Sequence, residues 1–219
     1  MPTIPYLNKK GTRVPGTTTV IGQTLGWNKE ALMYWAWKQG TEGKNYKDTS
    51  RKACDAGTIA HYLVEMALRN QVPDTANIYP DASPDDIDKA TTSYLNFVEW
   101  EGMMKFKPLE MEPHMVSERY QYGLTPDCIA MVNDQLAIFD WKTSKGVYPD
   151  MLLQLAAYEH GWNECHPRKK ITGGAYLLRI SPNNASFHFH HWKDLSAGWN
   201  AFLHALGLYH LYPNIKDLL

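Results

Sequence analysis

The sequence has 219 residues, of which 44% are hydrophobic and 21% charged, values typical of one large or two small water-soluble domains with a sizeable core. Its 22 Lys and Arg against 23 Asp and Glu give a net charge of -1, which excludes a polybasic coat that binds nucleic acid by charge alone. No apolar run approaches the roughly 20 residues of a membrane-spanning helix, so we expect no membrane partner.

The first half of the chain predicts one short strand and three helices. β-Branched residues favour the strand, while capping side chains and apolar residues spaced three and four apart favour the helices. The third helix has the clearest start, Ser83-Pro84-Asp85-Asp86, because a capping serine precedes proline and acids near the positive end of the helix dipole. We expect Gly40 to end the first helix. The predicted bounds are 17–24 for the strand and about 28–39, 49–69 and 83–104 for the helices.

The second half predicts strands with two helices among them. Short apolar runs bounded by turn-forming residues mark the strands. The last helix is apolar nearly all round, so we expect it to be well buried. Helices that precede and follow strands in this order predict an α/β layout with a mixed sheet covered by helices. The predicted strands are 115–122, 128–132, 135–140, 175–180 and 187–192, and the predicted helices are about 149–163 and 195–211.

Charge is spread unevenly along the chain. Residues 1–52 contain nine Lys or Arg and three Asp or Glu, whereas residues 73–118 contain three and ten. The simpler interpretation is a pair of solvated faces that happen to segregate. The alternative is a basic N-terminal lip beside a site that binds a polyanion.

The three cysteines predict a reducing compartment. Cys54, Cys128 and Cys165 lie far apart, which suits neither a disulfide framework nor a cysteine-rich zinc site. Residues 1–16 contain no apolar stretch of the signal-peptide type. We therefore expect a cytoplasmic protein.

Two carboxylates meet at the end of the predicted hairpin. If Asn133 and Asp134 form the whole loop, as a type I′ turn with positive φ at both residues, Asp127 faces Asp140 with Cβ atoms about 4.5–5.5 Å apart. Like charges placed opposite each other destabilise a sheet, unless a cation lies between them. Lys142 projects from the same strand face as Asp140, and hard oxygen ligands suit Mg²⁺ or Mn²⁺ rather than zinc. The alternative is a turn acid beside an ordinary surface ion pair.

Two helices supply further polar groups. Gly57 and His61 are four residues apart, and Glu65 continues their face. Because helical side chains lean over the preceding turn, Gly57 leaves an uncovered spot beside His61. Gln154 and Tyr158 are also four apart, and both can hold a phosphate or a catalytic side chain by hydrogen bonds. Taken singly, each pair also fits ordinary packing.

In chain order these residues form four motifs, Gly57-x-x-x-His61, Gly123-x-x-Pro126-Asp127, Asp140-x-Lys142 and Gln154-x-x-x-Tyr158. The set resembles the PD-(D/E)XK nuclease superfamily, in its RecB-like exonuclease branch, over about residues 53–160. The resemblance implies an α/β fold with a restriction-endonuclease-like core, a mixed central β-sheet flanked by helices, and an N-terminal helical extension. It also implies a single nuclease domain, with a lead-in and helix at 1–52, the catalytic core at 53–165 and a strand pair and helix at 166–219.

The same resemblance implies Mg²⁺- or Mn²⁺-dependent hydrolysis of DNA phosphodiester bonds by an exonuclease, with DNA as the partner. The implied metal ligands are His61, Asp127, Asp140 and the Trp141 carbonyl. Lys142 is implied to position the nucleophilic water, while Gln154 and Tyr158 are implied to support the site and touch DNA. The segment 14–25 and the helix after it resemble a DNA-facing lead-in.

Two features of other family members are missing. Members with an iron–sulfur cluster use four cysteines around the core, whereas this chain has three in other places, so we expect no cluster. The chain has no G-x-x-x-x-G-K-[ST] loop, so any helicase motor is a separate chain. A stand-alone nuclease of this kind resembles those of bacteriophages, which implies DNA recombination, repair or replication in an infected bacterial cell, with a recombination or replication protein as a further partner.

Two other functions fit the same residues. A structure-specific or restriction-like endonuclease on this fold needs no free DNA end. A non-catalytic DNA-binding module keeps the fold without turnover. Decay of that kind usually removes an acid or the lysine, and here every expected group is present, which favours catalysis.

Two groups of ring side chains have competing interpretations. His188 and His190 share a strand face, but no third zinc ligand follows from their spacing, so we expect a half-exposed edge strand. Tyr34, Trp35 and Trp37 in the first helix have a spacing typical of core residues. Stacking on the bases of a single nucleic-acid strand is the alternative.

Overall fold

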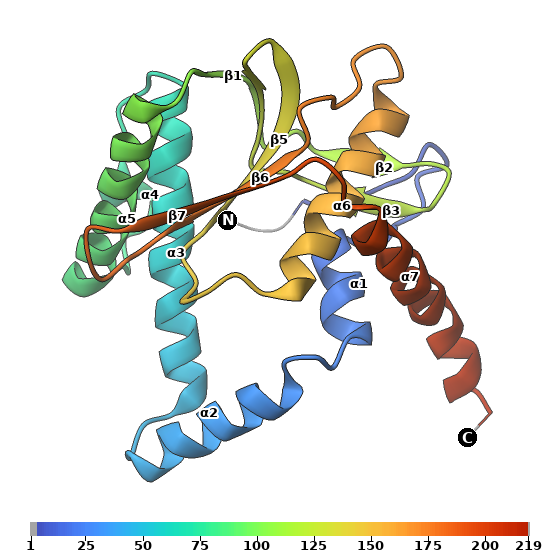
Figure 1. Cartoon of the computed structure of the whole chain (residues 1–219). Coiled ribbons are helices and arrows are strands. Elements are labelled where there is room, and N and C mark those ends of the chain that lie inside the picture. The colour runs from blue at the N-terminus through green and yellow to red at the C-terminus, as the bar shows by residue number, and fades with distance from the viewer. Residues whose placement is uncertain (1–3, 219) are drawn as a thin grey trace.

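The computed structural model describes residues 4–218, and its central feature is a five-stranded sheet (Figure 1). β5 and β6 pair in parallel, and the other neighbours pair antiparallel. In sheet order the strands are β1 (Phe106–Met111), β4 (Cys128–Val132), β5 (Gln135–Lys142), β6 (Ala175–Ile180) and β7 (Phe187–Trp192). A separate hairpin pairs β2 (Met115–Ser117) with β3 (Tyr122–Leu124). The expected α/β fold with a mixed sheet is confirmed.

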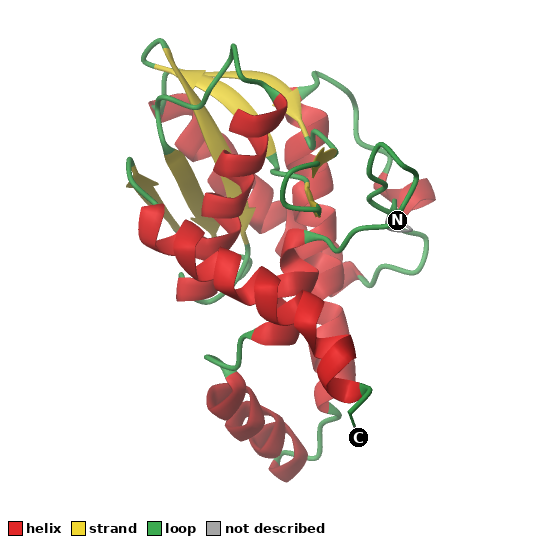
Figure 2. Cartoon of the chain, turned by 90° about the vertical axis from the view of Figure 1, so that its right-hand side faces the viewer, coloured by secondary structure: helices red, strands yellow, loops and turns green. Residues whose placement is uncertain are grey.

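Helices cover both faces of this sheet (Figure 2). Helices α1, α6 and α7 pack on one face, and α3 and α5 pack on the other. The helices are α1 (Thr17–Thr24), α2 (Lys29–Thr41), α3 (Tyr46–Leu68), α4 (Thr75–Ile78), α5 (Pro84–Met103), α6 (Pro149–Cys165) and α7 (Ser196–Lys216). Within residues 4–218, no helix combines the length and the apolar character needed to cross a bilayer.

The central strands alternate between these two helical layers. In β5, Ile138 packs with α6 and α7, whereas Phe139 and Trp141 pack with α3 and α5. Successive strand residues point to opposite faces, so Asp140 and Lys142 lie on the α6 side. The strand pattern therefore directs both polar groups toward one helix.

The β4–β5 hairpin has the predicted register. Cys128 pairs with Phe139, and the pairing closes at Val132 and Gln135. Asn133 and Asp134 have φ values of 49° and 60°, the signature of the expected type I′ turn. The hairpin prediction is confirmed.

The predicted helix starts are confirmed in one case and wrong in another. Helix α5 begins at the Ser83 cap, where Ser83 and Asp86 form a complete capping box. Helix α3 starts earlier than predicted, because Asn45 accepts the N–H of Lys47 at 3.0 Å. Gly40 does not end α2, which continues to Thr41.

Residues 17–24 form helix α1, so the predicted strand is wrong. Val20 and Ile21 are buried against α6 and α7, and this packing outweighs the β-propensity of the segment. The Thr24 hydroxyl also donates to the Val20 carbonyl at 2.7 Å, while Thr17 donates to the Gly123 carbonyl at 2.9 Å. Tertiary contacts therefore select the helix.

The strand predictions differ from the structure at two more places. The predicted strand 115–122 is two strands, because the chain reverses after Ser117 and Gln121 adopts a φ of 59°. Strand β1 was not predicted at all. Pro108 cannot donate to a sheet ladder, and it is tolerated here because β1 is an edge strand.

Strand β7 matches its prediction, whereas helix α7 differs from it. Strand β7 is an edge strand with His188 exposed, and its phenylalanines pack on the core, so the half-exposed edge is confirmed. Helix α7 is less buried than predicted. Trp199 and Phe202 lie in the core, whereas Leu208 and Leu211 are more than half exposed.

Candidate active site

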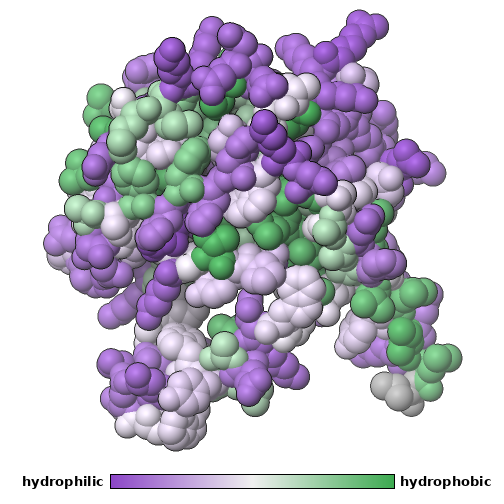
Figure 3. All heavy atoms as spheres, viewed as in Figure 1, coloured by the Kyte–Doolittle hydropathy of each residue, from purple (hydrophilic) through white to green (hydrophobic). Residues whose placement is uncertain are grey.

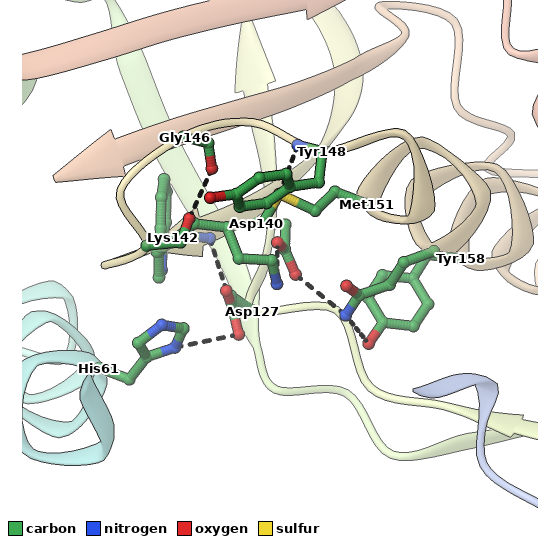
Figure 4. A network of polar contacts seen from close by, with 11 residues as sticks. His61, Asp127, Asp140, Lys142, Gly146, Tyr148, Met151 and Tyr158 are labelled. Atoms are coloured by element: carbon green, nitrogen blue, oxygen red, sulfur yellow. Dashed lines mark hydrogen bonds and ion pairs between the residues drawn. The ribbon is translucent and has the colours of Figure 1, made fainter. Parts of the chain in front are cut away.

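Four elements bring the predicted polar residues together at one end of the sheet (Figure 4). Helix α3 supplies His61, the ends of β4 and β5 supply the two aspartates and Lys142, and α6 supplies Gln154 and Tyr158. Four side-chain contacts, described next, join these residues into two groups, one of His61 and Asp127 and the other of the remaining four residues. The residues in this network are His61, Asp127, Asp140, Lys142, Gln154 and Tyr158.

Asp127 lies between β5 and helix α3. One carboxylate oxygen accepts the backbone N–H of Trp141 at 2.6 Å, and the other lies 3.4 Å from His61 Nδ1. Burial raises the pKa of Asp127, but the His61 imidazole, the Lys142 ammonium and the Trp141 N–H together outweigh it, and the net pKa is lowered. Burial likewise lowers the pKa of His61, but the carboxylates of Asp127 and Asp140 together outweigh it, so the His61 pKa is raised. These two groups favour an imidazolium–carboxylate pair.

Asp140 is the most deeply buried acid of the site, with 2% of its surface exposed. Burial raises its pKa to about 6, although the Lys142 ammonium acts in the opposite direction. One oxygen forms an ion pair with Lys142, while the other lies 3.5 Å from the Gln154 amide nitrogen. Burial lowers the pKa of Lys142, and the carboxylates of Asp140 and Asp127 outweigh burial and raise it.

Gln154 and Tyr158 face the site from α6, one helical turn apart. The Gln154 amide donates to the Tyr158 hydroxyl at 2.7 Å. Burial, followed by the charge of Asp140, raises the pKa of Tyr158 well above its ordinary value. Tyr158 therefore stays protonated at neutral pH and keeps an O–H that can donate toward the site.

The two motif glycines allow close approach of other segments. A Cβ at Gly57 would lie 2.9 Å from the Thr143 hydroxyl, so Thr143 occupies the space that we expected to remain open beside His61. A Cβ at Gly123 would lie 1.9 Å from the Tyr6 ring. Tyr6 also stacks on His114 and bonds to Thr125 at 2.8 Å. The absence of a side chain at Gly123 thus lets the N-terminal segment pack against the β2–β3 hairpin.

Sequence reasoning missed one acid beside the site. Glu112 follows the unpredicted strand β1, and its N–H donates to the Asp127 carbonyl at 3.0 Å. Burial, followed by the carboxylates of Glu65 and Asp127, raises the pKa of Glu112. The sequence of β1, Phe-Lys-Pro-Leu-Glu-Met, does not alternate regularly, and Pro108 argues against a strand, so no clear strand signal preceded Glu112.

The donor atoms of the site suit a hard divalent ion. Two carboxylates and an imidazole are ligand types that Mg²⁺ or Mn²⁺ accepts, and Asp140 Oδ2 is buried without a hydrogen bond, with Lys142 as its ion-pair partner. Among residues 4–218, no three His, Cys, Asp or Glu side chains are placed as a ready-made metal group. Each carboxylate is paired with a cationic side chain instead. The donor atoms therefore suit a divalent ion by type, while their present arrangement is that of two ion pairs.

One protein-family model matches the part of the chain that contains this site. The model of the family described as "Protein of unknown function (DUF2800)" matches residues 40–165. The chain belongs to the DUF2800 family. The match to DUF2800 includes every residue of the polar network, from His61 on α3 to Tyr158 on α6. No curated protein matches this DUF2800 chain.

The fold of this DUF2800 protein resembles that of a solved structure. The crystal structure of a "Putative exonuclease" from Eubacterium rectale has a TM-score of 0.50 and 13% identity, covering 69% of this chain. The DUF2800 chain spans 63% of that protein's length. The crystal structure of SSO0001 has a TM-score of 0.36 and 14% identity, with 71% of this chain and 87% of that chain covered. The first likeness shows a shared fold.

Proposed function

We propose that this DUF2800 protein is a nuclease of the PD-(D/E)XK type that hydrolyses DNA phosphodiester bonds from a free end with a divalent ion. The observation that carries the proposal is the buried Asp140–Lys142 ion pair beside the Asp127–His61 pair. Burying charges in this way costs stability, and a functional role would explain why the chain keeps them. The shared fold with a protein named as a nuclease supports the same interpretation.

Lys142 and Tyr158 are the groups suited to act on a phosphate. The Lys142 ammonium stands in a poorly hydrated site, where a fixed cation orients water and offsets developing negative charge. The protonated Tyr158 hydroxyl can donate to a phosphate oxygen. Gln154 holds Tyr158 from one turn away, so α6 acts as the support for this side of the site.

His61, Asp127, Asp140 and the Trp141 carbonyl are the proposed ligands of Mg²⁺ or Mn²⁺. When bound, such an ion would lower the pKa of a coordinated water and neutralise charge on the phosphate. Asp127 is held by its hydrogen bond from the Trp141 N–H. Asp140 is held by the rigid end of β5 and by Lys142. The main chain therefore sets the separation of the two acids.

A cleavage assay on end-labelled linear DNA with Mg²⁺ or Mn²⁺ tests this proposal. We expect shortening of the DNA, and we expect Asp140→Asn or Lys142→Gln to lower the rate by at least about 100-fold. Matched controls are Asp134→Asn at the exposed turn of the same hairpin and Lys107→Gln on exposed β1. Full activity of either site variant, or full activity in excess chelator, contradicts the proposal.

A covalently closed circle separates the two modes of cleavage. An exonuclease leaves the circle intact and degrades it once it has been linearised. Cleavage of the closed circle at a comparable rate indicates an endonuclease on the same fold. Metal-independent binding of DNA without any turnover indicates a binding module.

A further inference from the structure

A basic groove lies at the edge of the sheet where the parallel strands β5 and β6 end. It has a volume of about 880 Å³ and runs between the first half of α3, the loop after β5 and the loop after β6. The residues of the polar network, all of them in the described part of the chain, do not line it. Five cationic side chains line the groove, against one acid, Asp48. The cations are Lys44, Lys52, Lys89, Lys145 and Arg179.

The first half of α3 forms one wall of this groove. Of residues 46–55, all but Thr49 are exposed, and the first buried residue of the helix is Ala56. Figure 1 shows this part of α3 extending beyond the sheet toward α2. The residues of the wall recur every three or four positions from Asn45 to Gly57, so they share one helical face. At a rise of roughly 1.5 Å per residue, this wall is about 18 Å long.

Three of the groove cations are available to a ligand, because they form no ion pair with any residue in the described part of the chain. They are Lys52 on α3, Lys145 in the loop after β5 and Arg179 near the end of β6. Arg179 is half-buried, and its hydrogen bond to the Ser144 carbonyl at 3.4 Å orients the guanidinium. The one acid of the groove, Asp48, lies 3.5 Å from Arg51 on the same helix. The groove therefore keeps a positive charge that comes from three different elements.

The rest of the polar lining consists of hydroxyl and amide side chains. Together with lysine and arginine, these are the side chains that contact phosphate oxygens in nucleic-acid complexes. Among the described residues that line the groove, none is aromatic, so the groove offers no ring on which a base could stack. The hydroxyl and amide groups belong to Asn45, Thr49, Thr143, Ser144, Asn183 and Asn184.

The exposed rings of α2 lie outside the groove. Tyr34 and Trp37 are 63% and 62% exposed, so the core interpretation of these two rings is wrong. Neither ring lines the groove, and the α2 residue that does is Gln39, the one buried residue of that helix. In Figure 3, α2 forms the lobe at the lower left, where pale side chains gather. The contacts available within the groove are therefore contacts to phosphates.

We propose that this groove binds the phosphate backbone of nucleic acid without contacting its bases, with phosphates on Lys52, Lys145 and Arg179. Phosphates of one strand follow each other at about 3.4 Å along a duplex axis, so about five of them match a wall of about 18 Å. A single phosphate or a short polyphosphate would occupy only part of that length. Such a site recognises charge and spacing and is independent of sequence. The inference goes beyond the proposed function, because the groove can hold nucleic acid whether or not the polar network cleaves it.

Fluorescence anisotropy in excess chelator measures this binding without cleavage. We expect the full chain to bind a 20-nucleotide single strand and an abasic strand of the same length with affinities within about three-fold of each other. Lys52→Gln and Lys145→Gln should each lower the slope of log affinity against log salt by about 0.7, which is a loss of about five-fold in affinity at roughly 0.1 M salt. Both strands should lose affinity equally, because the lost contact is to phosphate.

Two variants and one polymer are the controls. Lys52→Arg keeps the charge in the groove, and Lys107→Gln removes an exposed charge on β1, so both should leave the affinity and the slope unchanged. Because Lys52, Lys145 and Lys107 are exposed, all these variants should keep the unfolding temperature of the parent protein. Polyglutamate carries carboxylates in place of phosphates, and we expect it to compete at least about ten-fold more weakly than the abasic strand at equal charge concentration.

The outcomes separate this inference from the proposed function. An abasic strand that binds at least about ten-fold more weakly than the ordinary strand overturns the inference, because bases are then required. Parent-like binding by both Lys52→Gln and Lys145→Gln overturns it as well, even if the protein cleaves DNA. Equal competition by polyglutamate also overturns it, since the groove then attracts any polyanion. Binding of the abasic strand that depends on Lys52, in a protein without cleavage under any ion, supports the inference and contradicts the nuclease function.

Discussion

Asp140 shows how the end of β5 keeps a carboxyl group ready for chemistry. Burial raises its pKa to about 6, and the Lys142 ammonium limits that rise. A buried ion pair returns little net stability, because both charges lose their hydration. The strand ends at this pair, so its position depends on backbone register rather than on side-chain flexibility.

Removal of the Lys142 ammonium tests its effect on the pKa of Asp140. In Lys142→Met the pKa of Asp140 should rise above about 6, since burial then acts without its main opposing charge. The measurement is a pH titration of aspartate carboxyl ¹³C shifts with chelator present. Lys107→Met is the control. An Asp140 pKa that stays the same or falls contradicts the ion pair.

At the scale of elements, the sequence predicts those helices and strands that are fixed by interactions within a few residues. The β4–β5 hairpin and the start of α5 were predictable because Asn133, Asp134 and the Ser83 cap act within a few residues. Helix α1 and strand β1 were not, because their partners lie far along the chain. The approach of the two aspartates followed from the hairpin register. Glu112 did not, since it depends on the unpredicted strand β1 beside β4.

Gly123 offers a test of how the N-terminal segment is held. Gly123→Ala places a methyl group inside the Tyr6 ring, so we expect a loss of about 2 kcal/mol or more in the free energy of unfolding. Tyr6→Ala should make the same substitution much less costly, which a double-mutant cycle in urea measures.

Gly22 in α1 is the matched control for that substitution. No atom lies within 4 Å of a Cβ added there, so Gly22→Ala should be neutral or stabilise the protein by about 0.5–1 kcal/mol. An equal cost at both glycines indicates that the Tyr6 contact does not hold the segment.

At the scale of the whole molecule, the candidate site lies where two packing layers meet. His61 comes from α3, which packs with α5 on one face of the sheet, and Gln154 comes from α6 on the other face. The hairpin acids stand between them. A ligand held by His61 and the two acids therefore binds α3 directly and reaches α6 through the contact of Asp140 with Gln154.

Hydrogen exchange followed by mass spectrometry tests this connection. Added Mg²⁺ or Mn²⁺ should slow amide exchange in α3 near His61 and in α6 near Gln154 together, because binding stabilises both layers. The exposed outer half of α7 should exchange as before. No protection of α3 near His61, or equal protection in Asp140→Asn, contradicts an ion held by His61 and Asp140.

Helix α2 buries one side chain and so adds little to the free energy of folding. Amino-acid replacements along its outer surface escape the selection that stability imposes on the core. These replacements remain subject to selection for any contact that the outer surface of the helix makes. The sequence of this helix can therefore vary while the acids and the lysine at the sheet end stay unchanged.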